Sequence, residues 1–505
     1  MSDEAIRRGF CLSGVICKWR SANAVRRRKE TGSRWAVVVL AAMLSGVATA
    51  AVPTSERSSL EAFYHATAGS TWANHTGWLG PAGTECAWFG VACNEEGDHV
   101  TSIELPYNHL VGTIAAELCD LRKLRTLDLS RNYYLTGGFP ELDNCDDLLH
   151  LDVSNSSMSG SLKPITHLTK LAYFDAVNNS FSGEIPDISG LTALSYFALA
   201  SGDESHPLSG DIPPIDSLHQ LTHFFLVGNA ITGRIPDLTG LTSLEWVQIA
   251  GDGLVGTVPE IAGLSNLQYF DISGAQLAGA LPAISALPNL QVYRVHDAHL
   301  VTASIPPIDW SPSLREIAVQ NLGLLGEIPD LSNAPNLQIL NVRNNRLSGQ
   351  LPDLSGLPGV VSIDVSNNAL SGALPSLQQF HDLQRLVARN NHFSGALASF
   401  NGLHELVEVN VSFNALSGEL PATIAGLPYL VRILVDHNQF VGAPPTVAQT
   451  VPLADAASLL CPNNLDPIPS DRWDRATALN GTSWYDNCGS IGQDTLLRDG
   501  FDRRF

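Results

Sequence analysis

The stretch of sequence that decides the fold is VSNNALSGALP, from Val365 to Pro375. Nearly the same sequence precedes it as VRNNRLSGQLP, residues 342–352, and follows it as VSFNALSGELP, residues 411–421. Repetition at a fixed period indicates a repeat architecture, in which one structural unit is stacked many times. The 505 residues must therefore be divided into repeats before they are divided into domains.

The glycine of this stretch sets the period. It returns after 23 residues in most cases and after slightly more elsewhere, with one lapse at Thr302. The glycines are Gly112, Gly137, Gly160, Gly183, Gly210, Gly233, Gly256, Gly279, Gly326, Gly349, Gly372, Gly395, Gly418 and Gly442. They define about fifteen units over residues 100–443.

Each unit carries the signal of a short strand followed by a turn. In one of them, apolar Leu340 and Val342 flank a polar residue, and this alternation predicts a strand with one buried face. The glycine and proline that follow turn the chain and prevent a long helix. Since no unit can bury its own leucines, neighbouring units must stack to bury them. We expect an α/β repeat solenoid with short parallel strands.

The full pattern, L-x-x-L-x-L-x-x-N-x-L-x-G-x-I-P, resembles the plant-type leucine-rich repeat over about two thirds of the chain. The resemblance implies a right-handed curved superhelix with the strands on its concave face. It also implies that the asparagine satisfies backbone groups where the chain leaves each strand. This place holds Asn108, Asn132, Asn179, Asn229, Asn345, Asn368, Asn391, Asn414 and Asn438, but Asp252, Ala275, Ala298 and Leu322 in the middle units. The substitutions predict less regular geometry around residues 250–325.

Both ends of the solenoid need caps to cover their terminal leucines. We assign the caps to residues 51–99 and 444–490. The segment CAWFGVAC, from Cys86 to Cys93, resembles the signature of the N-terminal cap in plant-type repeat proteins. At the other end, Cys461 and Cys488 bracket a looped segment. We therefore expect disulfide-bonded caps.

The cysteines outside residues 1–50 form couples that are local in sequence. They are Cys86 and Cys93, Cys119 and Cys145, and Cys461 and Cys488. An even number of cysteines in an exported chain favours disulfides, and none of them has the paired CxxC spacing of a zinc site. Cys119 and Cys145 lie at near-equivalent places in adjacent turns, which favours a staple between turns but leaves their pairing open.

Residues 1–50 have the composition of a signal peptide with a long basic region. Basic residues extend to Arg34, and the apolar segment WAVVVLAAMLSGV, residues 35–47, precedes the small residues ATA. Its thirteen residues are too few to span a bilayer. We expect a secreted, extracellular protein, with the periplasm or the cell surface as the alternative. No later apolar run is long enough for a membrane span, and the tail 491–505 is expected to be flexible.

The charge of the chain excludes some partners. Without residues 1–50, which hold nine Lys/Arg and three Asp/Glu, 20 basic and 47 acidic residues remain, a net charge of −27. Such a surface repels nucleic acid and anionic membranes, and no basic patch interrupts it. We expect no nucleic-acid partner.

The sequence contains no catalytic, phosphate-binding or calcium-binding motif, and no kinase motif, so we expect neither an enzyme nor a cofactor. Carboxylates such as Asp128, Asp152, Asp175, Asp271 and Asp364 recur at one strand position, and we interpret them as solvated repeat residues. The segment HDAH, residues 296–299, falls where the repeat lapses. A disrupted turn explains it better than a metal site.

One column of the concave face is aromatic. Residues two positions after the first leucine of each unit should point outward, and successive ones should lie about 4.8 Å apart. This aromatic column consists of His150, Tyr173, Tyr196, His223, Trp246 and Tyr269, and Phe225 widens it. Aromatic side chains exposed together are where binding energy concentrates. Tyrosine is also common at this position in the resembled family, so ordinary repeat filler and a contact between subunits remain alternatives.

These observations favour a secreted, non-catalytic recognition scaffold that binds a protein or peptide partner on its concave strand face and acts as a monomer. The candidate partner-binding residues are Tyr173, Tyr196, His223, Phe225, Trp246 and Tyr269. An envelope or adhesion structural protein, or a binder of cell-wall glycan, is the alternative. A role as an enzyme inhibitor is implied by the resemblance alone.

Overall fold

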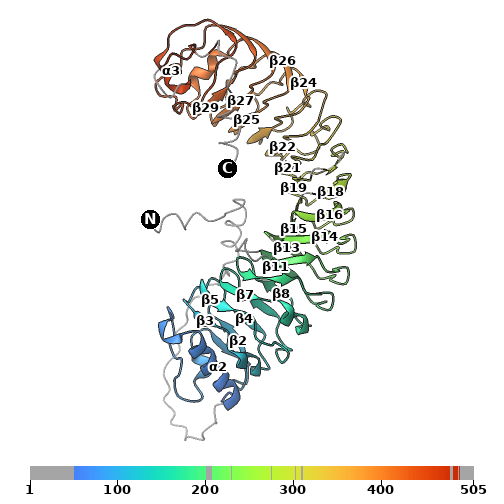
Figure 1. The fold of residues 1–505 in the computed structure, drawn as a ribbon, viewed down its shortest axis with the longest axis vertical. Helices are drawn as coiled ribbons and strands as arrows, with labels where there is room; N and C mark the ends of the chain where they lie inside the picture. The colour runs from blue at the N-terminus through green and yellow to red at the C-terminus, as the bar shows by residue number, and fades with distance from the viewer. Residues whose placement is uncertain are drawn as a thin grey trace, which may run out of the picture. The chain divides into compact units, whose positions relative to one another are not determined.

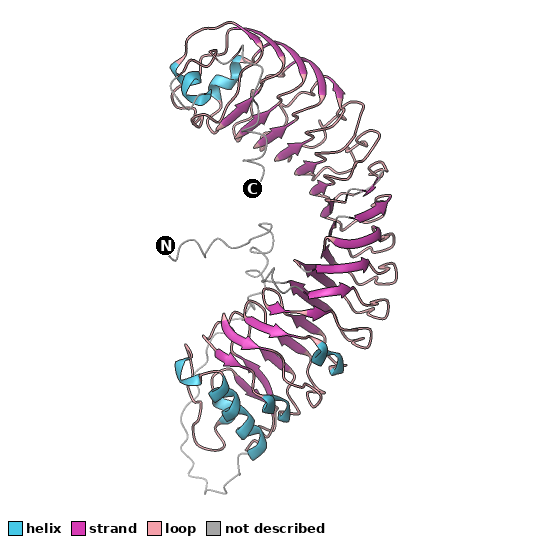
Figure 2. Cartoon of the chain, in the orientation of Figure 1, coloured by secondary structure: helices cyan, strands magenta, loops and turns pink. Residues whose placement is uncertain are grey.

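The units stack through one long sheet, which runs the length of the solenoid in Figures 1 and 2. The structure is a computed structural model that describes residues 51–477, 482–486 and 488, apart from 201–207, 229, 275, 299, 302, 309 and 310. The predicted signal peptide and tail lie outside these residues. Within them, no helix combines the length and the apolar character needed to cross a bilayer.

The long sheet has 16 strands, each paired with the strand one repeat away. They are β1 (Val91–Cys93), β2 (Val100–Glu104), β4 (Thr126–Asp128), β6 (His150–Asp152), β8 (Tyr173–Asp175), β11 (Tyr196–Ala200), β13 (His223–Val227), β15 (Trp246–Ala250), β17 (Tyr269–Ser273), β19 (Val292–His296), β21 (Glu316–Ala318), β22 (Ile339–Asn341), β23 (Ser362–Asp364), β25 (Arg385–Val387), β27 (Glu408–Asn410) and β29 (Arg432–Leu434). Only β1, in the N-terminal cap, runs antiparallel to its neighbour. The other fifteen strands are one per repeat, as the glycine period predicts.

Shorter sheets run along the solenoid where the chain leaves each unit. The first contains β3 (Val111–Thr113), β5 (Tyr134–Gly137), β7 (Ser157–Gly160) and β9 (Ser180–Phe181). The second contains β10 (Gly183–Glu184), β12 (Leu208–Asp211), β14 (Ala230–Arg234), β16 (Gly253–Thr257), β18 (Gln276–Gly279) and β20 (Leu300–Val301). The third contains β24 (Ser371–Gly372), β26 (His392–Ala396), β28 (Ala415–Glu419), β30 (Gln439–Gly442) and β31 (Asn464–Leu465). Within residues 49–505 the long sheet lines the concave side (Figure 1).

The core is one continuous stack of leucines and other apolar side chains between these layers. Leu337, Leu340, Val342 and Leu347 of one unit are all buried, and the equivalent residues of its neighbours cover them. Helix is scarce in the repeats. Three of them contain a short 3-10 helix: η4 (Ala116–Asp120), η5 (Lys163–His167) and η6 (Ala422–Gly426). Stacking, not local helix formation, therefore holds the units together.

The repeat asparagine does what the resemblance implies. The Asn345 amide nitrogen donates to the carbonyl oxygens of Val319 (2.7 Å) and Val342 (2.9 Å). Its oxygen accepts from the backbone N–H groups of Leu322 (3.2 Å) and Leu324 (3.1 Å). One buried amide thus satisfies four backbone groups in two adjacent units, and the strand ends after three residues, at Asn341.

Strand length changes along the long sheet. The strands from β11 to β19 each have five residues, against three in β21 to β29. This change does not follow the asparagine, because β13 lies in the unit of Asn229 and β21 in the unit of Leu322. The prediction of less regular geometry is wrong for β15, β17 and β19, because the ladder continues through them. Gly251 and Gly274 follow two of the long strands, and each allows a close approach. A Cβ at Gly251 would lie 2.4 Å from the Ile231 side chain, and one at Gly274 would lie 2.6 Å from the Gly251 carbonyl oxygen.

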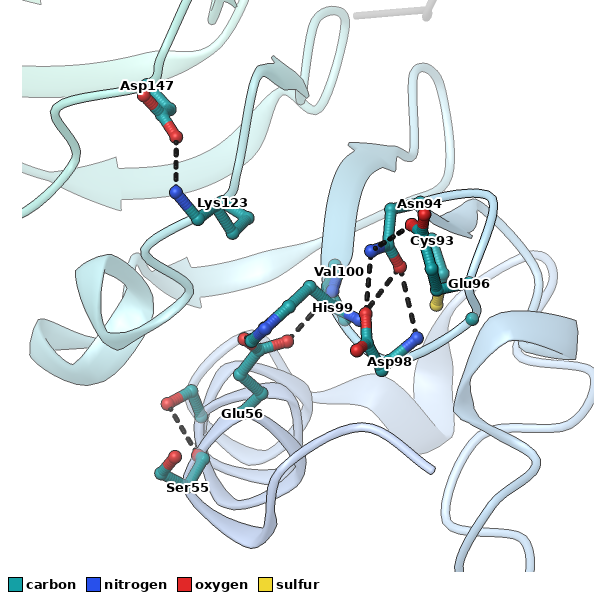
Figure 3. A network of polar contacts seen from close by, with 12 residues as sticks. Ser55, Glu56, Cys93, Asn94, Glu96, Asp98, His99, Val100, Lys123 and Asp147 are labelled. Atoms are coloured by element: carbon teal, nitrogen blue, oxygen red, sulfur yellow. Dashed lines mark hydrogen bonds and ion pairs between the residues drawn. The ribbon is translucent and has the colours of Figure 1, made fainter. Parts of the chain in front are cut away.

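An aromatic cluster and a polar network close the N-terminal end. Helix α2 (Thr54–Ala66) buries Phe63 against Trp72, and Trp72 and Trp78 meet edge to face with ring centroids 4.9 Å apart. Figure 3 shows the polar network beside them. Glu56 of α2 accepts from the backbone N–H of Val100 at 2.8 Å and contacts His99 Nδ1 at 2.6 Å. These contacts tie the cap to the first strand of the repeats.

The rest of this cap contains η2 (Gly69–Thr71) and η3 (Glu85–Ala87). The C-terminal end has α3 (Asp471–Thr477), which buries Trp473. The indole nitrogens of Trp473 and Trp484 donate to the carbonyl oxygens of Pro445 and Ile468, each at 2.9 Å.

Disulfides join the three cysteine couples. Cys86 is bonded to Cys93 in the N-terminal cap, and Cys461 to Cys488 at the C-terminal end. Cys119 and Cys145 are also bonded, with Cα atoms 4.9 Å apart. This third disulfide staples two adjacent turns, the alternative that the sequence left open.

Candidate functional site

The aromatic column is assembled by the register of the long sheet. His150 pairs with Tyr173, Tyr173 with Tyr196, Tyr196 with His223, His223 with Trp246, and Trp246 with Tyr269. Because the strands are parallel and in register, equivalent side chains lie one above the other. Sequence spacing is therefore converted directly into a row of neighbouring rings.

The rings stack face to face along most of the row. Ring centroids are 4.2 Å apart between His150 and Tyr173, and 4.3 Å apart between Tyr173 and Tyr196, with interplanar angles of 13° and 12°. Trp246 and Tyr269 are closer, at 3.7 Å and 3°. Since neighbouring rings cover each other's faces, the row presents mainly ring edges, hydroxyl groups and ring nitrogens to a partner.

The distance between neighbouring ring centroids is larger on both sides of His223 than elsewhere in the row. Tyr196 and His223 are 5.3 Å apart, and His223 and Trp246 are 6.4 Å apart with an interplanar angle of 10°. The distance between the centroids of His223 and Trp246 exceeds the roughly 4.8 Å between strands, as expected for two nearly parallel rings that are offset sideways. This is the widest spacing in the row.

Tyr269 lies in the row as expected, but its side chain is buried. It was predicted to be exposed with the other aromatic residues, but it is 2% exposed. Trp246 covers one side, and the Arg294 guanidinium lies 5.5 Å from the centroid of the Tyr269 ring. Its hydroxyl donates to Asp271 Oδ2 at 3.0 Å and accepts from Arg294 at 2.7 Å. Tyr269 is thus a support for Trp246, whereas Tyr173, Tyr196, His223, Phe225 and Trp246 are half-buried and reach the surface.

A polar network continues from Tyr269 toward the C-terminal units. Arg294 donates to both carboxylate oxygens of Glu316, at 2.6 and 2.8 Å, and approaches Asp271 Oδ2 at 3.4 Å. His296 lies between Asp271, at 3.2 Å, and Asp297, at 2.8 Å. Three carboxylates and two cations give this network a net negative charge when His296 is protonated.

The environment of His296 favours its charged form. Burial by itself would lower the pKa of the imidazole, but the hydrogen bonds to Asp271 and Asp297 outweigh it and raise the pKa to about 9. The pKa of Asp297 is lowered, first by its bond to His296. His296 belongs to the HDAH segment, and these ion pairs explain it without a metal; His299 lies outside the described residues.

The long strands add a floor beside the aromatic column. Phe225 lies at the third position of β13, next to Ala198 of β11 and Gln248 of β15. From β11 to β17 the fifth positions carry small side chains, namely Ala200, Val227, Ala250 and Ser273, and the fifth position of β19 is His296. Ala200 pairs with Val227, and Ala250 with Ser273. The expected site did not include this row. The repeat asparagine gave no signal for it, because β13 is a five-residue strand in the unit of Asn229 and β21 a three-residue strand in the unit of Leu322.

The recurring carboxylates are structural. Asp152, Asp175, Asp271 and Asp364 are buried, not solvated as predicted. Asp152 and Asp364 accept from the backbone N–H of the residue two positions on, at 2.9 and 3.1 Å, and Asp175 does the same at 3.0 Å. These bonds fix the turn that ends each three-residue strand. Within the residues that the structure describes, no group of three or more His, Cys, Asp or Glu side chains is placed to hold a metal ion.

Farther along the concave face, charged residues replace the aromatic ones. Arg385 contacts Asp364 at 3.2 Å and Glu408 at 3.0 Å, and Arg432 also pairs with Glu408. The Arg385 side chain is 39% exposed, against 18% for Arg294. The concave face therefore changes from aromatic to ionic along the solenoid.

Comparisons with known proteins agree with this architecture. Residues 336–357 match the family model described as Leucine Rich Repeat. The ectodomain of the Arabidopsis thaliana membrane receptor kinase GASSHO1/SCHENGEN3 superimposes with a TM-score of 0.65 and 26% identity, over 78% of this chain and 51% of that one. The chain has the architecture of a leucine-rich repeat solenoid. A TDR receptor structure also matches it, with a TM-score of 0.57 and 27% identity over 72% of this chain and 68% of the other.

Sequence relatives of the chain include Arabidopsis thaliana receptor kinases. Receptor-like protein kinase 7 is 34% identical over 100 residues, which are 19% of this chain and 10% of that protein. A receptor protein kinase-like protein is 43% identical over 58 residues, which are 10% of this chain and 8% of that protein. The chain thus covers about half of the first solved ectodomain and a tenth or less of these kinases.

Proposed function

We propose that this chain is an extracellular, non-catalytic recognition scaffold that binds an extended segment of a protein or peptide on its concave face, between β6 and β19. The single observation that carries the proposal is the stacked aromatic column with a row of small side chains beside it. Stacked rings lose little conformational entropy on binding, so they are efficient anchors.

The ring arrangement favours a peptide over a glycan. A sugar ring packs its C–H groups against the open face of an aromatic side chain, but stacking covers most of these faces. Ring edges, tyrosine hydroxyls and histidine nitrogens instead suit the N–H and C=O groups of a peptide backbone. The small side chains at Ala200, Val227 and Ala250 leave room for a main chain to lie close to the sheet.

The comparisons support ligand binding as the general use of this scaffold. The GASSHO1/SCHENGEN3 ectodomain was solved in complex with CASPARIAN STRIP INTEGRITY FACTOR 2. That ligand belongs to that receptor, and the partner of this chain is identified here only by its chemistry. Extracellular localisation and a monomeric state are parts of the same proposal.

Selection of displayed random peptides on the whole chain tests this function. The double variant Trp246→Ala/Phe225→Ala removes two anchors, and Ala250→Gln adds bulk to the floor without removing packing. Tyr429→Ala is the matched control, since Tyr429 is 54% exposed outside the aromatic column. We expect selected peptides to bind the wild type and the control equally and to bind the other two at least tenfold more weakly, with unchanged melting temperatures. Equal binding to all four proteins would place the site elsewhere.

A further inference from the structure

Two arginines lie at equivalent places on the concave side of the C-terminal units. Arg343 and Arg389 come two residues after the ends of β22 and β25, and Ser366 holds the same position in the unit between them. The backbone N–H of Asn344 donates to the Ser366 carbonyl oxygen at 2.9 Å, and that of Asn367 donates to the Arg389 carbonyl oxygen at 2.8 Å. The three positions are thus stacked, and the arginines lie two strand spacings apart, or roughly 9.6 Å.

These two arginines are unpaired although they are half-buried. Within the residues that the structure describes, neither guanidinium has a hydrogen bond or an ion pair, and the Nε atom of each is buried. The other described arginines without such bonds are all exposed: Arg122, Arg125, Arg131, Arg234, Arg315 and Arg346. Partial burial of an unpaired cation costs free energy. Acids are not scarce, since residues 51–505 hold 47 of them against 20 basic residues.

The carboxylates of the surrounding units have other partners. Asp364 Oδ1 accepts from Ser366 Oγ at 2.6 Å, and Asp364 Oδ2 contacts Arg385 at 3.2 Å. Asp297 and Asp436, farther along the chain in either direction, contact His296 and His437. Arg343 and Arg389 are therefore left for a group that comes from outside the chain.

Phe413 holds Arg389 in place without neutralising it. The guanidinium carbon lies 5.2 Å from the centroid of the Phe413 ring, which stacks on His437 with centroids 3.9 Å apart. A cation on a ring face keeps its charge and its N–H donors. Phe413 has a φ of 57°, and the same place in the four preceding units holds asparagine, which tolerates this conformation better. The ring is thus present at a cost in backbone strain.

We propose that Arg343 and Arg389 bind two carboxylate side chains of the partner, three residues apart on a segment in the polyproline II conformation. The inference rests on the proposed function and names the acidic segment beside the part held between β6 and β19. Arginine binds a carboxylate through two parallel N–H···O bonds. A polyproline II helix has about three residues per turn and rises about 3.1 Å per residue, so residues i and i+3 point the same way, roughly 9.3 Å apart. This separation matches two strand spacings.

Titration of the whole chain with blocked peptides tests the site. The probes are acetyl-Glu-Pro-Pro-Glu amide, its neutral analogue acetyl-Gln-Pro-Pro-Gln amide, the shorter acetyl-Glu-Pro-Glu amide, and sodium sulfate at equal ionic strength. NMR signals of the Nε–H groups of Arg343 and Arg389 report binding, because burial protects these protons from exchange. We expect saturable shifts with the first probe. The neutral analogue should bind at least tenfold more weakly, and the shorter peptide about threefold more weakly.

Variants separate binding from a structural role. Arg343→Met and Arg389→Met should each weaken binding of the first probe at least fivefold. Their melting temperatures should not fall, since each change removes a half-buried, unpaired charge. Arg346→Met is the matched control: Arg346 is exposed and unpaired in the unit of Arg343, and its loss should leave binding within twofold. Equal binding of the neutral analogue or of sulfate, no saturable shift, or unchanged binding by both arginine variants would each overturn the proposal.

The peptide selection distinguishes failure of this site from failure of the proposed function. If selected peptides depend on Trp246 and Phe225 but tolerate replacement of every acidic residue by its amide, the acidic site is wrong and the scaffold function stands. If no selected peptide depends on these aromatic residues, the scaffold function is wrong, and the blocked acidic peptide alone decides the site at Arg343 and Arg389.

Discussion

The middle units and the C-terminal units of this solenoid share one repeat and differ in how each strand ends. From β21 to β29 the strands have three residues, and in five of these six units the repeat asparagine bonds to the backbone after the strand. From β11 to β19 the strands have five residues, and the added positions form a second row beside the aromatic column. The asparagine alone does not set the strand length, because β13 is long in the unit of Asn229 and β21 is short in the unit of Leu322.

The largest expected effect concerns the asparagine itself. Asn345→Ala would leave four buried backbone groups without their partner, so we expect a loss of about 3 kcal/mol in the free energy of unfolding. Asp252 occupies the same repeat position in a long-strand unit and is exposed. Asp252→Ala should cost less than about 0.5 kcal/mol. Urea unfolding of the two variants compares them, and similar losses would mean that the asparagine does not distinguish the two regions.

The ion pairs of the two regions should also differ in how much they contribute to the free energy of unfolding. Arg294→Met leaves Asp271 and Glu316, with side chains 7% and 13% exposed, without their shared cation. We expect a cost of about 2–3 kcal/mol. The equivalent change at Arg385, which is 39% exposed, should cost about 1 kcal/mol or less. A melting temperature that falls more for Arg385→Met would contradict the assignment of the stronger network to the middle units.

The stability of the middle units should depend on pH through His296. Its pKa of about 9 in the folded protein exceeds the ordinary 6.5, so the folded state binds this proton more tightly. The resulting stabilisation, on the order of 2 kcal/mol, is fully present below pH 6.5 and is lost as the pH rises through 9. Unfolding measured between pH 6 and 10 checks this. In His296→Gln that part of the pH profile should be flat, and an unchanged profile would assign the effect to another group.

The smallest effect concerns the glycines that follow the long strands. Gly251→Ala would place a methyl group 2.4 Å from the Ile231 side chain, and we expect a cost of about 1–2 kcal/mol. A Cβ at Gly240 would meet nothing within 4 Å, which makes Gly240→Ala the matched control. Equal melting temperatures for the two variants would show that the turn after β15 relaxes freely.

Much of the architecture follows from local sequence. The glycine period and the apolar alternation predict fifteen stacked strands, because a unit with leucines that it cannot cover must use its neighbours. The same register predicts that His150, Tyr173, Tyr196, His223 and Trp246 form one row, since parallel strands in register place equivalent residues one above the other. The role of the repeat asparagine is the one that the resemblance to the plant-type repeat implied.

Other features depend on contacts between units, which no single repeat encodes. Tyr269 is buried because Arg294, one unit later, lies over its ring and is itself held by Glu316. The ring centroids are also unequally spaced along regularly paired strands, with Trp246 3.7 Å from Tyr269 and 6.4 Å from His223. Position in the repeat decides which side chains become neighbours. The sizes, charges and hydrogen bonds of those neighbours decide which of them are buried.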